Sequence, residues 1–141
     1  ITVHDIDESN NAKIYGIKDY PSLSDVFSRI HDANLNTRAN LVLSRDGIDS
    51  FEKFVYGVGY LTKIGADSIS TWPLRNVEND QIDSRLSPSE NELDKMRTWV
   101  DLNKSKYNIR FIYQKNPVWY KINNKLTLFP DGSLDSNWCN R

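Results

Sequence analysis

The sequence contains a single cysteine, Cys139, among its 141 residues. One thiol excludes an internal disulfide, and it excludes a metal site built from several cysteines of this chain. The sequence also lacks an apolar run of about 18 residues, the length needed to cross a bilayer, and it shows no charged and then apolar leader. We therefore expect a cytoplasmic protein with no membrane partner.

An excess of charge of either sign is also missing. The chain has 18 basic and 19 acidic residues, and its aromatic residues lie within apolar patterns. This balance gives no sign of the basic surface that nucleic-acid binding requires, so we expect no nucleic-acid partner. The sequence has no glycine-rich phosphate loop, no nucleophile elbow and no histidine pair at metal-binding spacing, which argues against a hydrolase.

The stretch from Asn36 to Arg75 has the pattern of a strand, a helix and a second strand. Thr37 to Leu43 is apolar and rich in β-formers, and Ser44 to Gly47 has the polar and glycine composition of a loop. Asp67 to Trp72 restarts an extended pattern. Such a unit requires parallel strands joined by a right-handed crossover.

The helix of this unit is predicted from its cap and its apolar stripe. Asp49 is placed to cap it, with Glu52 at the third position, and Gly65 stands where a helix end favours positive φ. The buried stripe is predicted to consist of Phe51, Phe54, Val55, Val58 and Leu61.

Similar signals place the remaining elements. Ser22 is predicted to cap a helix that ends near Asn34. Ser87 is predicted to cap a later helix, with Pro88 at its first position and Glu90 turning back to the cap. Asn123-Asn124 between two alternating runs predicts a hairpin turn. The other expected elements are strands at 1–3 and 109–113 and hairpin strands at 118–122 and 125–129.

This order predicts an α/β fold, namely a partial (β/α) barrel. We expect about four parallel strands in consecutive order with helices on one face, over residues 1–115, followed by a β-hairpin and tail over 116–141. The chain begins at Ile1 inside a strand pattern, so we expect it to be a piece of a longer protein. Its core would be incomplete alone, and the exposed barrel edges would favour a dimer.

Ligands of parallel folds gather at the C-terminal ends of the strands. Asn40, Ser44 and Arg75 lie at or near such ends, and His4 follows the first strand. Each also has a plain structural interpretation. The Asn40 amide could form hydrogen bonds with a neighbouring strand or loop, and Arg75 could pair with a surface carboxylate. His4 could be a hydrogen-bonded structural residue.

The segments ITVHDIDESNNAKIYGI and ANLVLSRDGIDSFEKFVYGVGYLTKIGADSISTWPLR resemble the later strands of radical S-adenosylmethionine enzymes. This family includes the GTP-cyclising enzyme of molybdenum-cofactor synthesis and glycyl-radical activating enzymes. The likeness covers roughly residues 1 to 115. It rests on strands that end at polar residues and on the pattern N-x-V-L-x-x-x-G-I-D, which begins at Asn40.

The resemblance implies an enzyme whose [4Fe-4S] cluster, held by three cysteines, cleaves S-adenosylmethionine to a 5′-deoxyadenosyl radical. The CxxxCxxC motif is absent here. We therefore expect the cluster to be bound by residues outside this chain, and the chain alone to be inactive. It would supply cofactor and substrate contacts only, with no catalytic residue and no metal ligand identified.

By the same resemblance, Asn40, Thr2 and His4 match positions that contact S-adenosylmethionine. Arg75 matches a polar strand end that faces cofactor or substrate, and we place Ser44 with it as a substrate contact. The substrate, whether a peptide, a nucleotide or a small metabolite, is left open. Two alternatives also stay open, an unrelated barrel enzyme of aldolase or isomerase type and a non-catalytic binding module.

Overall fold

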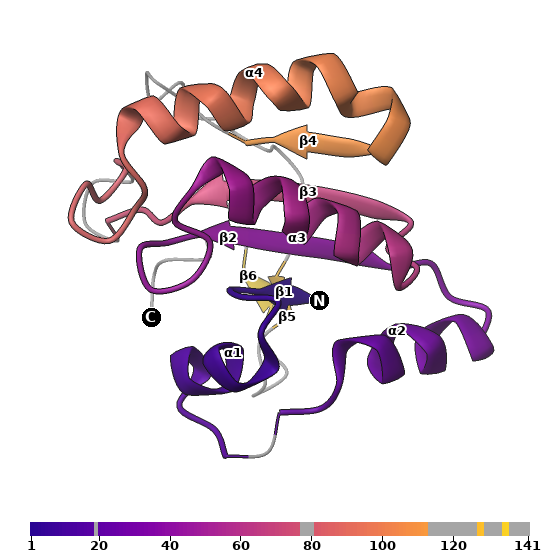
Figure 1. Cartoon of the computed structure of the whole chain (residues 1–141). Helices are drawn as coiled ribbons and strands as arrows, with labels where there is room; N and C mark the ends of the chain where they lie inside the picture. The colour runs from indigo at the N-terminus through magenta and orange to yellow at the C-terminus, as the bar shows by residue number, and fades with distance from the viewer. Residues whose placement is uncertain (19, 77–80, 113–126, 129–133, 136–141) are drawn as a thin grey trace.

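A four-stranded parallel sheet forms the centre of the computed structural model, which describes all residues except 19, 77–80, 113–126, 129–133 and 136–141. Its strands are β1 (Thr2–Val3), β2 (Arg38–Leu43), β3 (Ser68–Pro73) and β4 (Ile109–Phe111), in the order β1-β2-β3-β4 (Figure 1). All three pairings are parallel. The predicted α/β class and the consecutive parallel order are confirmed.

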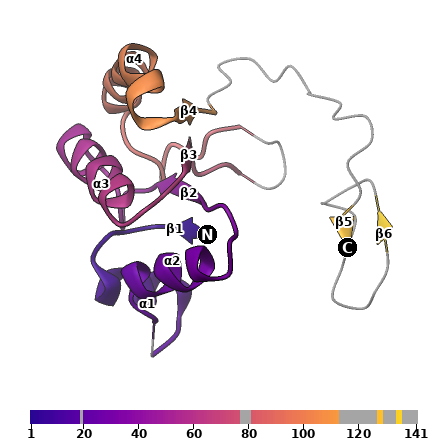
Figure 2. The same ribbon diagram turned by 90° about the vertical axis from the view of Figure 1, so that its right-hand side faces the viewer.

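The described residues form four helices beside the sheet. They are α1 (Glu8–Tyr15), α2 (Leu23–Asp32), α3 (Phe51–Lys63) and α4 (Glu90–Tyr107). In Figure 2, α3 and α4 lie on the same side of the sheet, while α1 and α2 lie beyond its β1 edge. None of the helices in the described part of the chain is long and apolar enough to span a membrane.

Two of the predicted helix caps were wrong by one or two residues. Ser50, not Asp49, caps α3 by accepting a hydrogen bond from Lys53 N, because the Asp49 carboxylate pairs instead with the Lys53 ammonium at 3.0 Å. Ser89, not Ser87, caps α4, because the Ser87 hydroxyl donates to Leu74 O at 2.8 Å. Gly65 adopts φ +104° after α3, as its position predicted.

The core lies between the sheet and the helices. Leu41 on β2 faces α3, since its Cδ2 lies 3.8 Å from the place where a side chain on Gly57 would begin. Strand side chains alternate between the two faces, so Asn40 and Val42 point the other way. The fully buried core side chains of β2, α3 and α4 include Leu41, Leu43, Phe54, Val58, Leu61 and Met96.

Thr37 ties the start of β2 to the start of β3. Its hydroxyl lies 2.9 Å from both Gly65 O and Asp67 Oδ2, and Asp67 N donates to it at 3.1 Å. The Asp67 carboxylate accepts from Thr37 N at 2.6 Å and lies 3.0 Å from His31 Nε2. The backbone hydrogen bond from Thr37, helped by His31, lowers the pKa of Asp67 to about 2. Stability from this carboxylate is therefore lost as the pH falls from its ordinary pKa through about 2.

Two buried threonines should respond with opposite signs to the same substitution. Thr37→Val removes a hydroxyl that satisfies Gly65 and Asp67, which should cost about 1 to 3 kcal/mol of unfolding free energy. Thr71 is fully buried and its Oγ1 has no partner among the described residues, so Thr71→Val should gain about 1 kcal/mol. Urea unfolding at constant m-value measures both. Changes of the same sign would contradict this assignment.

Only part of the predicted C-terminal hairpin lies within the described residues. β5 (Thr127–Leu128) pairs antiparallel with β6 (Leu134–Asp135). The expected turn at Asn123-Asn124, the strand at 118–122 and Cys139 lie outside the described residues.

Candidate ligand-binding face of the sheet

Polar side chains form one row across the far face of the sheet, which is the face turned away from α3 and α4. Thr2 is the register partner of Asn40, Asn40 of Ser70, and Ser70 of Arg110. Register partners on neighbouring strands share a face, and Asn40 points away from the helix side. These four residues, one from each strand, are called the polar row below. Strands lie roughly 4.8 Å apart, so the row is about 14 Å long.

The polar row has unused hydrogen-bonding capacity. The structure gives the side chains of Asn40, Ser70 and Arg110 no hydrogen bond or ion pair with any other described residue. Ser70 is only 3% exposed, Asn40 is half-buried, and Arg110 is exposed. A buried amide or hydroxyl normally finds a partner in the protein. A row of polar groups with no internal partner is suited to a ligand.

The far face also differs in charge from the chain as a whole. The strand residues on this face are Thr2, Arg38, Asn40, Val42, Ser68, Ser70, Trp72 and Arg110. They include two arginines and no carboxylate, although the whole chain has a net charge of −1. The far face of the described strands is therefore locally positive.

His4 and Ser44 lie at the C-terminal edge of the sheet, as predicted. The backbone N–H of His4 donates to Asn11 Oδ1 at 2.9 Å, and the ring packs edge-on against Tyr15 at 5.1 Å between centroids. Burial lowers the pKa of His4, so it is neutral near pH 7. His4 Nδ1 and Ser44 Oγ are both buried without a partner among the described residues.

A tight loop connects these two positions. Ser44 N donates to Ile48 O at 3.1 Å, and Gly47 N donates back to Ser44 O at 3.2 Å. A Cβ on Gly47 would lie 2.0 Å from His4 O and 3.2 Å from Ser44 Oγ. Only glycine allows the loop to approach the end of β1 this closely, and this contact brings His4 and Ser44 to the same corner of the sheet.

Arg75 begins the long loop that follows β3. It forms an isolated antiparallel bridge with Ile82, and Asp83 N donates to Leu74 O at 3.1 Å, so the loop folds back on itself. Arg45 holds this loop against the end of β2, with Nε 3.0 Å from Ser87 O. Arg75 therefore lies at the predicted strand end but outside the polar row.

Ser70 and Arg110 were missed by the sequence reasoning. Both lie in strands that alternate polar and apolar residues, Ser68-Ile69-Ser70 and Ile109-Arg110-Phe111. This alternation could have assigned them to the far face. It could not have shown that they stand level with Asn40, because register depends on pairing between distant segments.

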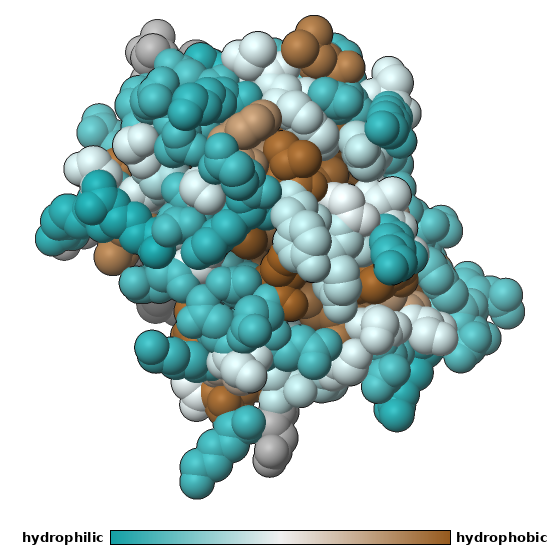
Figure 3. Space-filling model, viewed as in Figure 1, coloured by the Kyte–Doolittle hydropathy of each residue, from teal (hydrophilic) through white to brown (hydrophobic). Residues whose placement is uncertain are grey.

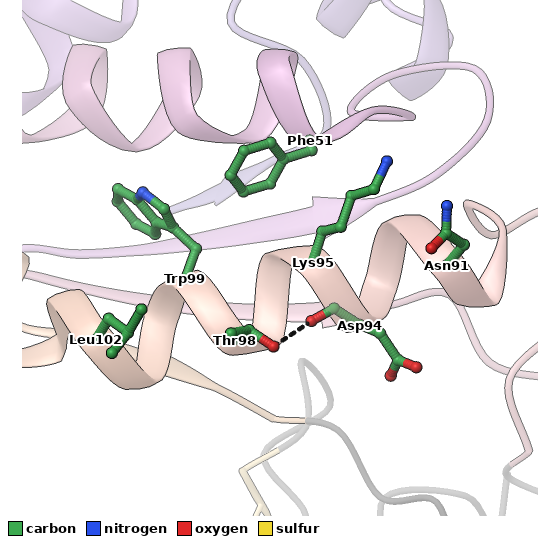
Figure 4. Close-up of a pocket in the computed structure, with 7 residues that line it drawn as sticks. All are labelled: Phe51, Asn91, Asp94, Lys95, Thr98, Trp99 and Leu102. Atoms are coloured by element: carbon green, nitrogen blue, oxygen red, sulfur yellow. Dashed lines mark hydrogen bonds between the residues drawn. The ribbon is translucent and has the colours of Figure 1, made fainter.

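A separate groove of about 460 Å³ lies on the helix side of the molecule. Figure 4 shows that Phe51 of α3 and Trp99 of α4 point into it, with Leu102, Lys95 and Asn91 along α4. In Figure 3 hydrophobic residues emerge between the helices on a largely hydrophilic surface. The groove contains none of the predicted site residues.

Within the described residues no three His, Cys, Asp or Glu side chains are grouped to hold a metal ion. The polar row offers the neutral side chains of Thr2, Asn40 and Ser70 together with the guanidinium of Arg110. No protein-family model matches the chain, and neither a curated protein nor a solved structure is significantly similar to it.

Proposed function

We propose that this chain is the C-terminal part of a radical S-adenosylmethionine enzyme with a partial (β/α) barrel. In such an architecture the helices lie outside and the far face of the sheet turns to the interior, with ligands bound toward the C-terminal ends of the strands. The proposal combines the resemblance at residues 1 to 115 with the parallel sheet and its polar row. The cluster that generates the 5′-deoxyadenosyl radical from the bound cofactor would be held elsewhere in the full protein.

One observation supports the cofactor assignment most directly. Thr2 and Asn40, two of the residues that match cofactor-contacting positions, are register partners on the far face. The same resemblance selected both residues, from segments 38 residues apart, and they are neighbours across β1 and β2. The half-buried Asn40 amide has no partner among the described residues.

The chemistry of these side chains fits the polar parts of S-adenosylmethionine. The Asn40 amide offers two donors and an acceptor, and the Thr2 hydroxyl offers one donor beside it. Together they could fix the orientation of a ribose or an amino-acid moiety. His4, neutral and at the edge of the sheet, could accept or donate one hydrogen bond. These residues position a ligand and move no proton in the proposed role.

Asn40→Ala in the full-length protein should weaken S-adenosylmethionine binding. Loss of one or two hydrogen bonds to a half-buried partner costs about 1 to 3 kcal/mol. This corresponds to roughly fivefold to 150-fold weaker binding. Isothermal titration calorimetry of the cofactor into wild-type and variant protein measures the change in affinity.

Asn36→Ala is the matched control, because Asn36 is an exposed asparagine just before the same strand. It should leave the affinity unchanged. Equal affinities for wild-type and Asn40→Ala would make Asn40 a structural residue. The upstream coding sequence gives a second test: absence of CxxxCxxC would remove the radical assignment and favour an unrelated barrel enzyme or a binding module.

A further inference from the structure

We infer that Arg110 and Ser70 form an anion subsite that holds a carboxylate or phosphate of the substrate. The assignment of the anion to a substrate rests on the proposed function. The subsite itself depends only on the described residues. It lies at the β4 end of the polar row, away from Thr2 and Asn40. The shared chemistry of its ligand is an oxyanion.

The first argument is the state of the two side chains. Ser70 is 3% exposed, and its hydroxyl has no hydrogen-bond partner among the described residues. Arg110 is its register partner on β4 and has no ion pair in the described part of the chain. A guanidinium beside a serine hydroxyl offers a fork of N–H donors and one O–H donor to the same oxyanion.

The second argument is electrostatic. The described strand residues of the far face include no carboxylate that could neutralise Arg110. Arg38, the other cation on this face, lies two strands away, with its Nε 3.4 Å from the hydroxyl of Ser68. Serines of β3 thus lie between two arginines. This arrangement attracts a negative group toward the middle of the sheet.

The third argument is spacing. Asn40 and Arg110 lie two strands apart, about 10 Å at the usual strand separation. One end of the row can therefore contact a cofactor while the other contacts a separate anionic molecule. The inferred substrate class is a molecule that carries a carboxylate or phosphate group.

The test is a titration of the full-length protein with inorganic phosphate and, separately, with succinate. The Nε–Hε signal of Arg110 and the amide signal of Ser70 are followed by NMR, with sodium chloride as the control for ionic strength. We expect saturable shifts with at least one oxyanion. Saturation by phosphate alone or by succinate alone identifies which anion the subsite holds.

Arg110→Gln should weaken this binding at least about tenfold, or ~1.4 kcal/mol. Arg110→Lys keeps the charge but loses the planar fork of N–H donors. Its anion affinity should lie between those of the wild type and Arg110→Gln. Arg29→Gln is the matched control, because Arg29 is an exposed arginine on α2. It should bind like the wild type, and far-UV circular dichroism checks that each variant is folded.

Shifts no larger than those caused by chloride, or shifts that persist in Arg110→Gln, would overturn the subsite. A titration with S-adenosylmethionine separates the two proposals. If Arg110→Gln weakens cofactor binding as much as anion binding, the anion is the cofactor's own carboxylate and the substrate assignment fails. If the cofactor does not bind at all while phosphate or succinate does, the proposed function fails and the subsite stands.

Discussion

Gly47→Ala should destabilise the protein by about 3 kcal/mol or more, because a new methyl group would meet backbone. Its Cβ would lie 2.0 Å from the carbonyl oxygen of His4, much closer than any van der Waals contact. Neither atom belongs to a flexible side chain. The loop must therefore move away from the end of β1, which disturbs its hydrogen bonds and the bridge between Leu43 and Ile48.

Thermal unfolding monitored by circular dichroism measures this effect. A loss of 3 kcal/mol corresponds to a fall in Tm of roughly 10 °C for a domain of this size. Gly59→Ala is the matched control, since a Cβ there meets nothing within 4 Å and the residue lies in α3. It should stabilise the protein by about 0.5 to 1 kcal/mol. A Gly47→Ala protein as stable as the wild type would show that the loop does not pack against β1.

Phe54→Ala should cost about 3 to 5 kcal/mol, because it removes a fully buried aromatic side chain and leaves a cavity. Phe54 lies on α3, and its ring meets that of Trp99 on α4 edge-on at 5.7 Å between centroids. It therefore contributes both to the core and to the contact between the two helices that cover one side of the sheet.

Urea unfolding of Phe54→Ala gives the change in free energy, and Phe54→Leu serves as the control. Leucine keeps most of the apolar volume, so this variant should lose less than about 1.5 kcal/mol. Truncation of Leu102, which is 81% exposed, should have almost no effect. If Phe54→Ala cost under about 1 kcal/mol, the seam between α3 and α4 would not be part of the core.

These stability variants bear on the binding proposals. The contact of Gly47 with His4 lies at the C-terminal edge of the far face, and Phe54 supports the sheet from the other side. Asn40 and Arg110 point to the far face, and their side chains make no hydrogen bond or ion pair with any other described residue. Changes at Asn40 or Arg110 should therefore alter binding with little loss of stability, which keeps the two kinds of effect separable.

The sequence by itself determined the type and order of the main elements. The apolar spacing from Phe51 to Leu61 predicted α3, and the β-rich runs before Ser44 and Pro73 predicted β2 and β3. These patterns are local, since each depends on which side of one element meets the core. The positive φ of Gly65 followed equally from its place at a helix end.

Side-chain competition decided the caps. Asp49 and Ser87 could both cap a helix, but other groups engage their side chains. Lys53 pairs with Asp49, and the Ser87 hydroxyl donates to Leu74 O, so Ser50 and Ser89 are the caps. The second partner is distant in sequence, so local rules could not choose between neighbouring caps. The four-stranded parallel sheet confirms the α/β class. The barrel would need further strands and belongs to the proposed function.

The site shows the same division between local and distant information. Sequence reasoning selected Asn40 from its strand pattern and from the family resemblance, and Thr2 from the resemblance alone. It could not rank either residue against Ser70 or Arg110. Backbone hydrogen bonds between four separate strands set the register that aligns all four residues. Only the tertiary structure could decide this alignment, because a shift of one residue in any strand would turn its side chain to the opposite face.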